Sequence, residues 1–184
     1  MVISGPSGVG KDTLIERLCE RDPSLRYSIS YTTRKPRPGE VEGANYCFVS
    51  RGRFEELIKQ GFFLEHAIYN GNYYGTPAAA VEEARATGHD ILLKIEVQGA
   101  AQVRKRAPDG LFIFIAPPSK EELVRRQERR EGGVPDDDMA ERLKIAETEM
   151  KHSSDYDHVV VNDELERAVG EVLEIIQRAR ERQT

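Results

Sequence analysis

Cysteine is scarce in this chain, which excludes the classes of protein that depend on it. The two cysteines, Cys19 and Cys47, stand far apart in the sequence, so neither a disulfide framework nor a zinc knuckle is predicted. The four histidines also lack the spacing that is typical of metal ligands. Both cysteines are therefore expected to be small buried hydrophobic residues of a protein that works in the reducing cytoplasm.

Long apolar runs and an excess of positive charge are missing as well. No apolar stretch approaches the length of a membrane span, and the N-terminus lacks a basic segment followed by an apolar core, so neither a membrane partner nor a leader is expected. The formal charge of −5 argues against nucleic acid as a partner. Arginine nevertheless outnumbers lysine more than twofold and gathers at 34–37 and 125–130, and planar guanidinium groups suit phosphate.

A glycine-rich loop near the N-terminus is the most informative motif present. It follows the apolar residues Val2 and Ile3 and precedes a helical pattern that begins at Leu14. Glycines let the backbone N–H groups turn inward, Lys11 adds a positive charge, and the helix directs its N-terminus at an anion. The loop is predicted to bind the phosphates of a nucleoside triphosphate through Gly5, Pro6, Ser7, Gly8, Val9, Gly10, Lys11, Asp12 and Thr13.

Asp12 departs from the usual form of this motif. A Ser or Thr normally follows the lysine and reaches Mg²⁺ with its hydroxyl, whereas here Thr13 comes one place later. A carboxylate is a hard oxygen ligand for the metal, yet it would stand beside a negatively charged phosphate. Asp12 is thus the candidate Mg²⁺ ligand, and the open alternative is that it points away and the metal is held through water.

Strand and helix patterns alternate along the chain, which predicts an α/β fold with a parallel sheet covered on both faces. Apolar segments are candidate buried strands, and two amphipathic segments are candidate helices. The strands are expected at 91–96, 111–115 and 157–161, and the helices at about 11–21 and 164–182.

Two stretches interrupt this pattern within a single domain. The segment 30–79 holds short β-like pieces at 46–49, 62–69 and 72–74 and a helix near 53–60, and the segment 120–151 holds two charged helices. The predicted organisation is a core of residues 1–29, 80–119 and 152–184, a small subdomain at 30–79 and a lid at 120–151.

The segment from Ser30 to Glu40 predicts a second anion site. Arg34 and Arg37 stand three residues apart on a loop stiffened by prolines, and Tyr46 follows. The alternative is an ordinary exposed loop rich in proline and glycine. Two separate phosphate sites would allow a donor triphosphate and an acceptor phosphate to be bound together.

These motifs, taken in order, resemble the guanylate kinase family. The resemblance covers nearly everything from Ile3 to Asn162, and it rests on the glycine loop, on Thr-Thr-Arg-Lys-Pro-Arg-Pro-Gly-Glu, and on Gly71–Thr76, Val97–Gly99, Ala116–Ser119 and Val161–Asp163. It implies a three-layer P-loop nucleotide kinase fold with a parallel central sheet, a small mixed β-rich GMP-binding subdomain and a helical lid. The implied reaction transfers the γ-phosphate of ATP to GMP, and also to dGMP, with Mg²⁺ as the cofactor.

The resemblance also implies how GMP is bound. Its phosphate would be held by Arg34, Arg37, Tyr46 and Tyr74, and its guanine would be recognised by Ser30, Glu65, Thr76 and Glu96. Guanine offers N1–H and an exocyclic amine as adjacent donors, so a carboxylate such as Glu65 can accept from both. Adenine has an acceptor at N1 and would leave that carboxylate unpaired.

The implied catalytic residues are cations placed around the transferred phosphoryl group. Because the acceptor oxygen is already anionic, alignment and charge neutralisation are the main requirements. Lys11 would bridge the β- and γ-phosphates, Asn162 would lie near the adenine, and the remaining catalytic residues would be Arg37, Arg126, Arg130 and Arg142. Surface ion pairs are the alternative interpretation of charged helices of this kind.

Lys94 is a second departure, because guanylate kinases usually carry an acid at this position as well as at Glu96. An ion pair between Asp12 and Lys94 is a hypothesis that would link the two departures. Two other functions stay open: a kinase for another monophosphate such as AMP, and a scaffold module that binds phosphorylated peptides. The intact glycine loop favours catalysis, and the oligomeric state is left open.

Overall fold

The computed structural model describes residues 1–130 and 139–182, and the side chains of residue 130 and of residues 139–142 are outside this description. The chain forms two compact units, one of Met1–Pro23 with Leu111–Thr184 (unit 1) and one of Ser24–Gly110 (unit 2). The predicted division into core, subdomain and lid uses other boundaries and stays a prediction.

Unit 1 is built on three parallel strands in the order β1 (Val2–Ser4), β8 (Phe112–Ala116) and β9 (His158–Val161). Every residue of β8 is buried, as expected for an apolar strand inside a parallel sheet. The helices of the unit are α1 (Lys11–Arg21), α5 (Lys120–Arg130), α6 (Met139–Lys151) and α7 (Leu165–Glu181), with a 3₁₀ turn at Ser153–Asp155.

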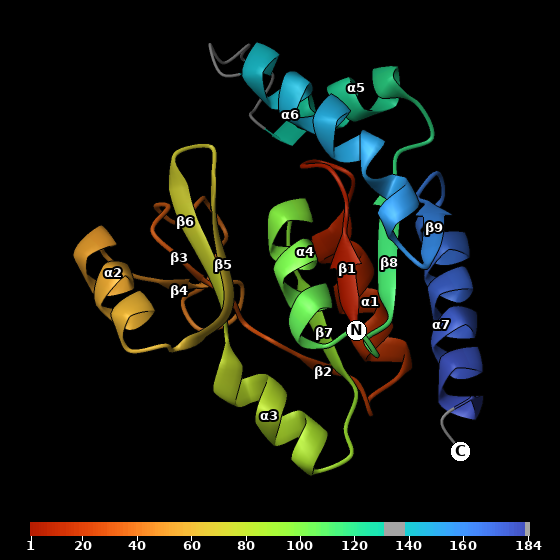
Figure 1. The fold of residues 1–184 in the computed structure, drawn as a ribbon. Helices are drawn as coiled ribbons and strands as arrows, with labels where there is room; N and C mark the ends of the chain where they lie inside the picture. The colour runs from red at the N-terminus through yellow and green to blue at the C-terminus, as the bar shows by residue number, and fades with distance from the viewer. Residues whose placement is uncertain (131–138, 183–184) are drawn as a thin grey trace. The chain divides into compact units, whose positions relative to one another are not determined.

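The helix α7 closes unit 1 because its sequence carries one apolar stripe. Ala168, Val169, Val172, Ile175 and Ile176 are all buried, at the three- and four-residue spacing of a single helix face. In Figure 1, α7 is the blue helix, and it packs against α1 and β9. The predicted helices at 11–21 and 164–182 and the strands at 111–115 and 157–161 are confirmed to within one residue at each end.

Unit 2 holds a four-stranded sheet in the order β4 (Cys47–Phe48), β3 (Tyr31–Thr32), β6 (Asn72–Pro77) and β5 (Phe63–Tyr69). The pair β3–β4 is parallel, and β6 is antiparallel to β3 and β5. Asn70 (φ 45°) and Gly71 (φ 73°) connect β5 to β6, and an Asn-Gly pair with positive φ at both positions is the favoured two-residue hairpin turn. The mixed sheet predicted for this segment is confirmed.

Aromatic side chains form the core between this sheet and α2 (Arg51–Lys59). The ring of Phe54 stacks on Phe63 at 4.4 Å and on Tyr73 at 5.0 Å between centroids. A Cβ on Gly75 would lie 2.8 Å from the Phe63 ring, so only glycine fits there. In Figure 1, α2 and α4 (Val97–Arg106) lie on opposite sides of the sheet.

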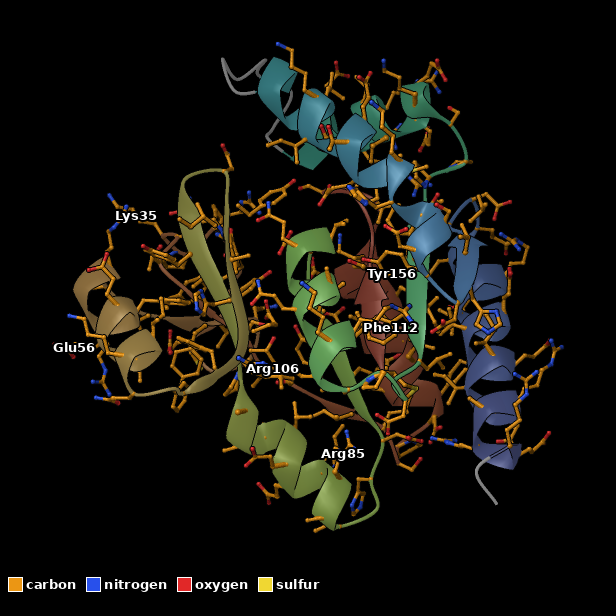
Figure 2. All side chains as sticks on the ribbon, in the orientation of Figure 1. Lys35, Glu56, Arg85, Arg106, Phe112 and Tyr156 are labelled. Atoms are coloured by element: carbon orange, nitrogen blue, oxygen red, sulfur yellow. The ribbon has the colours of Figure 1, made fainter. Side chains whose placement is uncertain are left out.

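The rest of unit 2 consists of the parallel pair β2 (Arg26–Tyr27) and β7 (Ile91–Lys94), with α3 (Ala78–Ala86) leading toward β7. Arg106, labelled in Figure 2 at the end of α4, donates to the backbone oxygens of Phe63 and Leu64 and so ties α4 to β5. The prediction of a strand at 91–96 was wrong for its last two residues, because β7 ends at Lys94 and Glu96 caps α4.

Candidate active site

The glycine loop connects β1 to α1, and its shape admits no side chain at two positions. Gly5 has φ 140°, and a Cβ placed on it would lie 2.2 Å from the backbone oxygen of Ile115. Gly10 caps α1 with φ 94°, and its Cβ would lie 2.7 Å from Nδ2 of Asn162. The loop therefore lies tightly against β8 and the end of β9, and it leads directly into the N-terminus of α1, where anions are favoured.

Lys11 is the first residue of α1, and its side chain folds back over the loop. Its Nζ donates to the backbone oxygens of Gly5 at 2.5 Å and Pro6 at 3.0 Å. Asp12 and Thr13, the next two residues, are exposed. The ammonium of Lys11 is thus held at the rim of the predicted phosphate site.

Two side chains from other elements hold the loop by its backbone oxygens. Asn162 Nδ2 donates to Val9 O at 2.8 Å, and Gln127 Nε2 donates to Ser7 O at 2.7 Å. Both side chains are buried, at 5% and 3% exposure. Asn162 was predicted near the adenine and Gln127 was not predicted at all, and in the structure both fix the conformation of the loop.

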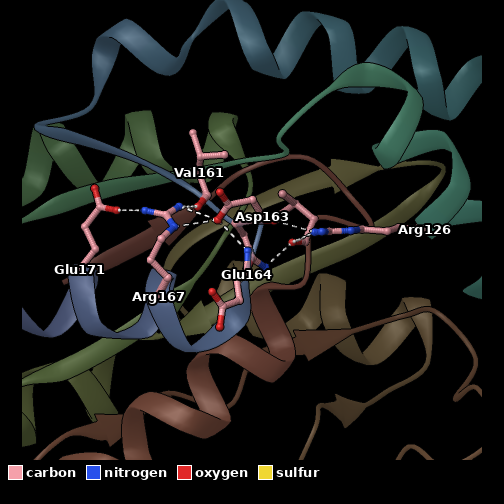
Figure 3. Close-up of polar contacts among 8 residues, drawn as sticks. Arg126, Val161, Asp163, Glu164, Arg167 and Glu171 are labelled. Atoms are coloured by element: carbon pink, nitrogen blue, oxygen red, sulfur yellow. Dashed lines mark hydrogen bonds and ion pairs between the residues drawn. The ribbon is translucent and has the colours of Figure 1, made fainter.

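Arg126 lies at the same junction and is engaged by neighbours within unit 1. It donates to Asn162 O at 2.9 Å and forms an ion pair with Glu122 at 3.0 Å. Figure 3 shows it beside the start of α7, where Arg167 bridges Asp163 and Glu171. Its predicted role at the γ-phosphate stays a prediction, and the side chains of Arg130 and Arg142 are outside the described residues.

The predicted phosphate clamp of unit 2 centres on Arg34. Its guanidinium forms two hydrogen bonds with the Glu40 carboxylate, at 2.7 and 2.9 Å, and lies 5.4 Å from the centroid of the Tyr46 ring. The rings of Tyr46 and Tyr74 meet edge to face at 5.9 Å. The structure therefore brings three of the four predicted phosphate-binding residues together.

Glu40 is a residue of this clamp to which sequence reasoning gave no role. Its carboxylate also accepts from the backbone N–H of Arg37 at 2.7 Å. Burial opposes the charge of Glu40, but the hydrogen bonds from Arg34 and Arg37 outweigh it and hold the pKa of this carboxyl below its ordinary value. Glu40 stays charged at neutral pH, orients the guanidinium of Arg34 and holds the backbone of Arg37.

The residues predicted to recognise guanine form a buried polar group in unit 2. Glu65 and Thr76 are directly paired across β5 and β6, so their side chains share one face of the sheet. Thr76 Oγ1 donates to Glu65 Oε1 at 2.7 Å. Glu65 and Ser30 are each 4% exposed, and Thr76 is fully buried. Among the described residues, Ser30 Oγ has no hydrogen-bond partner.

The buried carboxyl of Glu65 is electrostatically unusual. Burial is the largest influence and raises the pKa of Glu65 to about 7, the Thr76 hydrogen bond opposes the rise, and the charge of Glu96 adds to it. Hydrogen-bond donors of a ligand would stabilise the charged form of this buried carboxylate, because a buried acceptor without a hydrogen bond lowers stability. Among the described residues, the hydroxyl of Ser30 in this group has unused hydrogen-bonding capacity.

Glu96 and Gly99 shape this polar group from the N-terminus of α4. The Glu96 carboxylate accepts from the backbone N–H groups of Gln98 at 2.7 Å and Gly99 at 2.6 Å, which is N-cap geometry. A Cβ on Gly99 would lie only 2.3 Å from Glu65 Oε2. Gly99 therefore permits the close approach of Glu65, a role that sequence reasoning missed although the Val-Gln-Gly motif was noted. A contact between Glu96 and guanine stays a prediction.

Lys94, at the end of β7, places its Nζ 4.4 Å from the centroid of the Tyr46 ring. The hypothesis of an ion pair with Asp12 joins residues of two separate units and stays a prediction. No group of three or more His, Cys, Asp or Glu side chains among the described residues is arranged to hold a metal ion. None of the helices in the described part of the chain is long and apolar enough to cross a membrane.

A parallel strand, a glycine loop and a helix N-terminus in one unit, with a mixed sheet carrying an arginine clamp in the other, are typical of the P-loop nucleotide kinases. Comparison with known proteins narrows this class. The family model for guanylate kinase matches residues 1–179. The chain belongs to the guanylate kinase family and is an enzyme, which confirms the predicted family, fold class and enzyme class.

Individual relatives agree along nearly the whole chain. The guanylate kinase of Desulfitobacterium hafniense (strain Y51) is 48% identical to this chain, over 96% of this chain and 88% of its own length. The guanylate kinase of Rubrobacter xylanophilus is 49% identical, over 97% of this chain and 93% of its own length. The crystal structure of guanylate kinase from Anaplasma phagocytophilum matches with a TM-score of 0.82 at 36% identity, over 96% of this chain and 83% of that one. A gluconokinase from Sinorhizobium meliloti matches with a TM-score of 0.54 at 17% identity, over 99% of this chain and 93% of that one, and shares the fold alone.

Proposed function

We propose that this enzyme transfers the γ-phosphate of ATP to GMP, and also to dGMP, giving ADP and the nucleoside diphosphate. The observation that carries the proposal is the buried group of Ser30, Glu65 and Thr76, with a carboxylate and an unpartnered hydroxyl among the described residues. Guanine presents adjacent N1–H and N2–H donors to such a carboxylate and an O6 acceptor to a hydroxyl. Adenine presents none of these in the same arrangement.

The acceptor phosphate would be bound by the clamp that Glu40 orients. Arg34 and Arg37 supply the charge, and Tyr46 and Tyr74 supply hydroxyl groups beside Arg34. Planar guanidinium groups make paired hydrogen bonds to phosphate oxygens, which fixes the orientation of the nucleotide as well as its affinity. Arg37, whose backbone is held by Glu40, would keep its guanidinium on the acceptor phosphate during transfer.

The triphosphate of ATP would bind at the glycine loop. Lys11, held at the rim of the loop by Gly5 O and Pro6 O, would exchange these contacts for the β- and γ-phosphate oxygens. Transfer needs in-line alignment and neutralisation of charge rather than a general base, since the attacking oxygen of a monophosphate is already anionic. Arg126, Arg130 and Arg142 of the predicted lid would supply further positive charge.

Mg²⁺ fits this donor site, because the ion is usually held by one or two carboxylates with water and substrate phosphates rather than by a protein cage. Asp12, exposed beside Lys11 at the start of α1, is the residue that would hold it, directly or through water. When bound, Mg²⁺ would neutralise charge on the phosphates. The proposed location is the cytoplasm, where both cysteines would stay reduced, and both are free thiols in the structure.

The test is an ADP-release assay with GMP, dGMP, AMP, CMP and UMP offered in turn. GMP and dGMP should be preferred over AMP by at least about a hundredfold in kcat/KM, because the wrong base leaves buried polar groups unpaired. Glu65→Gln should lower this preference by at least about tenfold, since it removes a charged hydrogen-bond acceptor. Equal rates with AMP, or an unchanged preference in Glu65→Gln, would refute the assignment of the base site.

A further inference from the structure

A third cation lies at the acceptor clamp, contributed by an element outside the arginine loop. Lys94 ends β7, and its Nζ is 4.4 Å from the centroid of the Tyr46 ring and 5.8 Å from that of Tyr27. The Arg34 guanidinium carbon is 5.4 Å from the same Tyr46 ring. Tyr46 is therefore in contact with two cations, and such contacts hold an ammonium or guanidinium group close to an aromatic ring.

The charges of the clamp show what Lys94 adds. Glu40 forms an ion pair with Arg34 and so offsets part of the positive charge that the loop offers to a phosphate. A monophosphate ester carries about −1.5 to −2 charges near neutral pH. Lys94 places a further cation beside Tyr46, and a positive charge there would favour the binding of such an anion.

Two other charged residues close to Lys94 or to the arginine loop have different surroundings. The carboxylate of Glu96, two residues beyond Lys94, accepts from two backbone N–H groups of α4. Lys35, the third basic residue of the arginine loop, is exposed and lies on the outer side of the unit near α2 in Figure 2. Within unit 2, Lys94 is a lysine whose ammonium lies beside the clamp.

We propose that Lys94 binds the phosphate of the acceptor nucleotide, together with the arginines and Tyr46, as a phosphate-binding residue of this particular chain. The inference rests on the proposed function, because it concerns the same acceptor site. It gives a role to a lysine at a position where the family resemblance leads one to expect an acid. An ammonium group has three donors on a flexible stem, so it can reach a phosphate oxygen while its stem stays against the tyrosine rings.

The experiment measures binding of GMP and of guanosine to the wild type and to Lys94→Met by titration calorimetry. Guanosine keeps the base contacts and lacks the phosphate. Removal of Lys94 should weaken GMP binding by about fivefold to thirtyfold, as expected for a charged hydrogen bond at a partly exposed site, and leave guanosine binding unchanged. Lys94→Arg should restore most of the GMP affinity, and Lys59→Met, which removes an exposed lysine from the end of α2, should change neither ligand.

Three results would overturn the proposal. GMP binding that is unchanged in Lys94→Met would show that the ammonium does not contact the phosphate. Equal losses for GMP and guanosine would show an effect on the base site or the fold. A third result would show that Lys94 acts through Asp12 and not on the acceptor phosphate. In that case Asp12→Asn and Lys94→Met would change the dependence of activity on ATP and Mg²⁺ non-additively, while GMP binding would stay the same. Failure of the wild type to phosphorylate GMP would count against the proposed function. The comparison of GMP and guanosine binding would still test whether Lys94 contacts the phosphate.

Discussion

The Gly99→Ala variant tests how closely the fold positions Glu65, the carboxylate proposed to bind guanine. The new Cβ would lie 2.3 Å from Glu65 Oε2 and 3.0 Å from Glu65 Cδ. Nonbonded carbon and oxygen atoms need about 3.4 Å, so the carboxylate must move by about 1 Å. A displacement of this size turns a hydrogen bond of about 2.9 Å into a contact of about 3.9 Å, which is no longer a hydrogen bond.

Gly99→Ala is expected to weaken nucleotide binding more than it lowers the stability of the fold. The carboxylate is the end of a flexible side chain and can yield, so we expect a loss of stability of about 1–2 kcal/mol from overpacking. A hydrogen bond to a charged group contributes about 1.5–3 kcal/mol, and its loss should raise KM for GMP by about tenfold to a hundredfold. The KM for ATP should stay within about twofold, because the nearest neighbours of the new Cβ are Glu65 and Glu96, which belong to the predicted base site.

The assay compares GMP with IMP, which keeps N1–H and O6 but lacks the exocyclic amine. Gly99→Ala should reduce the preference for GMP over IMP, since the displaced carboxylate no longer accepts from the amine. Gly52→Ala is the matched control, because a Cβ on Gly52 in α2 meets nothing within 4 Å. If KM rose equally for both nucleotides, or for neither, the close approach of Glu65 to Gly99 would have no part in recognition.

Further predictions concern the pH dependence, the glycine loop and the acceptor clamp. Because the folded pKa of Glu65 is raised to about 7, lowering the pH through this value protonates the carboxyl and should weaken GMP binding, while Glu65→Gln should flatten the profile; a pH-independent Kd in the wild type would contradict this. The same shift means that the folded state binds the extra proton, so Glu65 favours stability below its unfolded pKa and this contribution is lost as the pH rises toward 7. Gln127→Leu removes the hydrogen bond to Ser7 O and should raise KM for ATP by about threefold to tenfold with KM for GMP unchanged; steady-state kinetics with each substrate varied in turn checks this, and an effect on GMP alone would argue against it. Arg37→Ala should lower kcat by at least about tenfold at saturating nucleotide. The control is Arg53→Ala, which removes an exposed arginine of α2 and should leave kcat unchanged. Equal turnover in the two variants would refute the predicted catalytic role of Arg37.

Much of the fold and part of the site could be predicted because the signals are local. The glycine loop, the Asn70-Gly71 turn and the apolar stripe of α7 each lie within a few consecutive turns of chain, and each requires particular residue types for steric or burial reasons. The residues of the predicted clamp and base site belong to one unit and come together as expected at Arg34, Tyr46 and Tyr74 and at Glu65 and Thr76.

Contacts between distant segments could not be predicted in this way. Glu96 continues an apolar strand pattern, and only the start of α4 shows that its carboxylate caps a helix. Gly99 and Glu65 are neighbours because α4 packs against β5, and Gln127 contacts Ser7 although many residues separate them. No local pattern marks either pair.

The amino-acid sequence by itself determined the family, and it predicted the phosphate loop and the acceptor clamp, because these depend on residue types at fixed short spacings. The tertiary structure alone decided the charge state of Glu65, the support of the loop by Gln127 and Asn162, and the place of Lys94 beside Tyr46. Burial and electrostatic interaction depend on which segments pack together, and chain spacing does not contain that information.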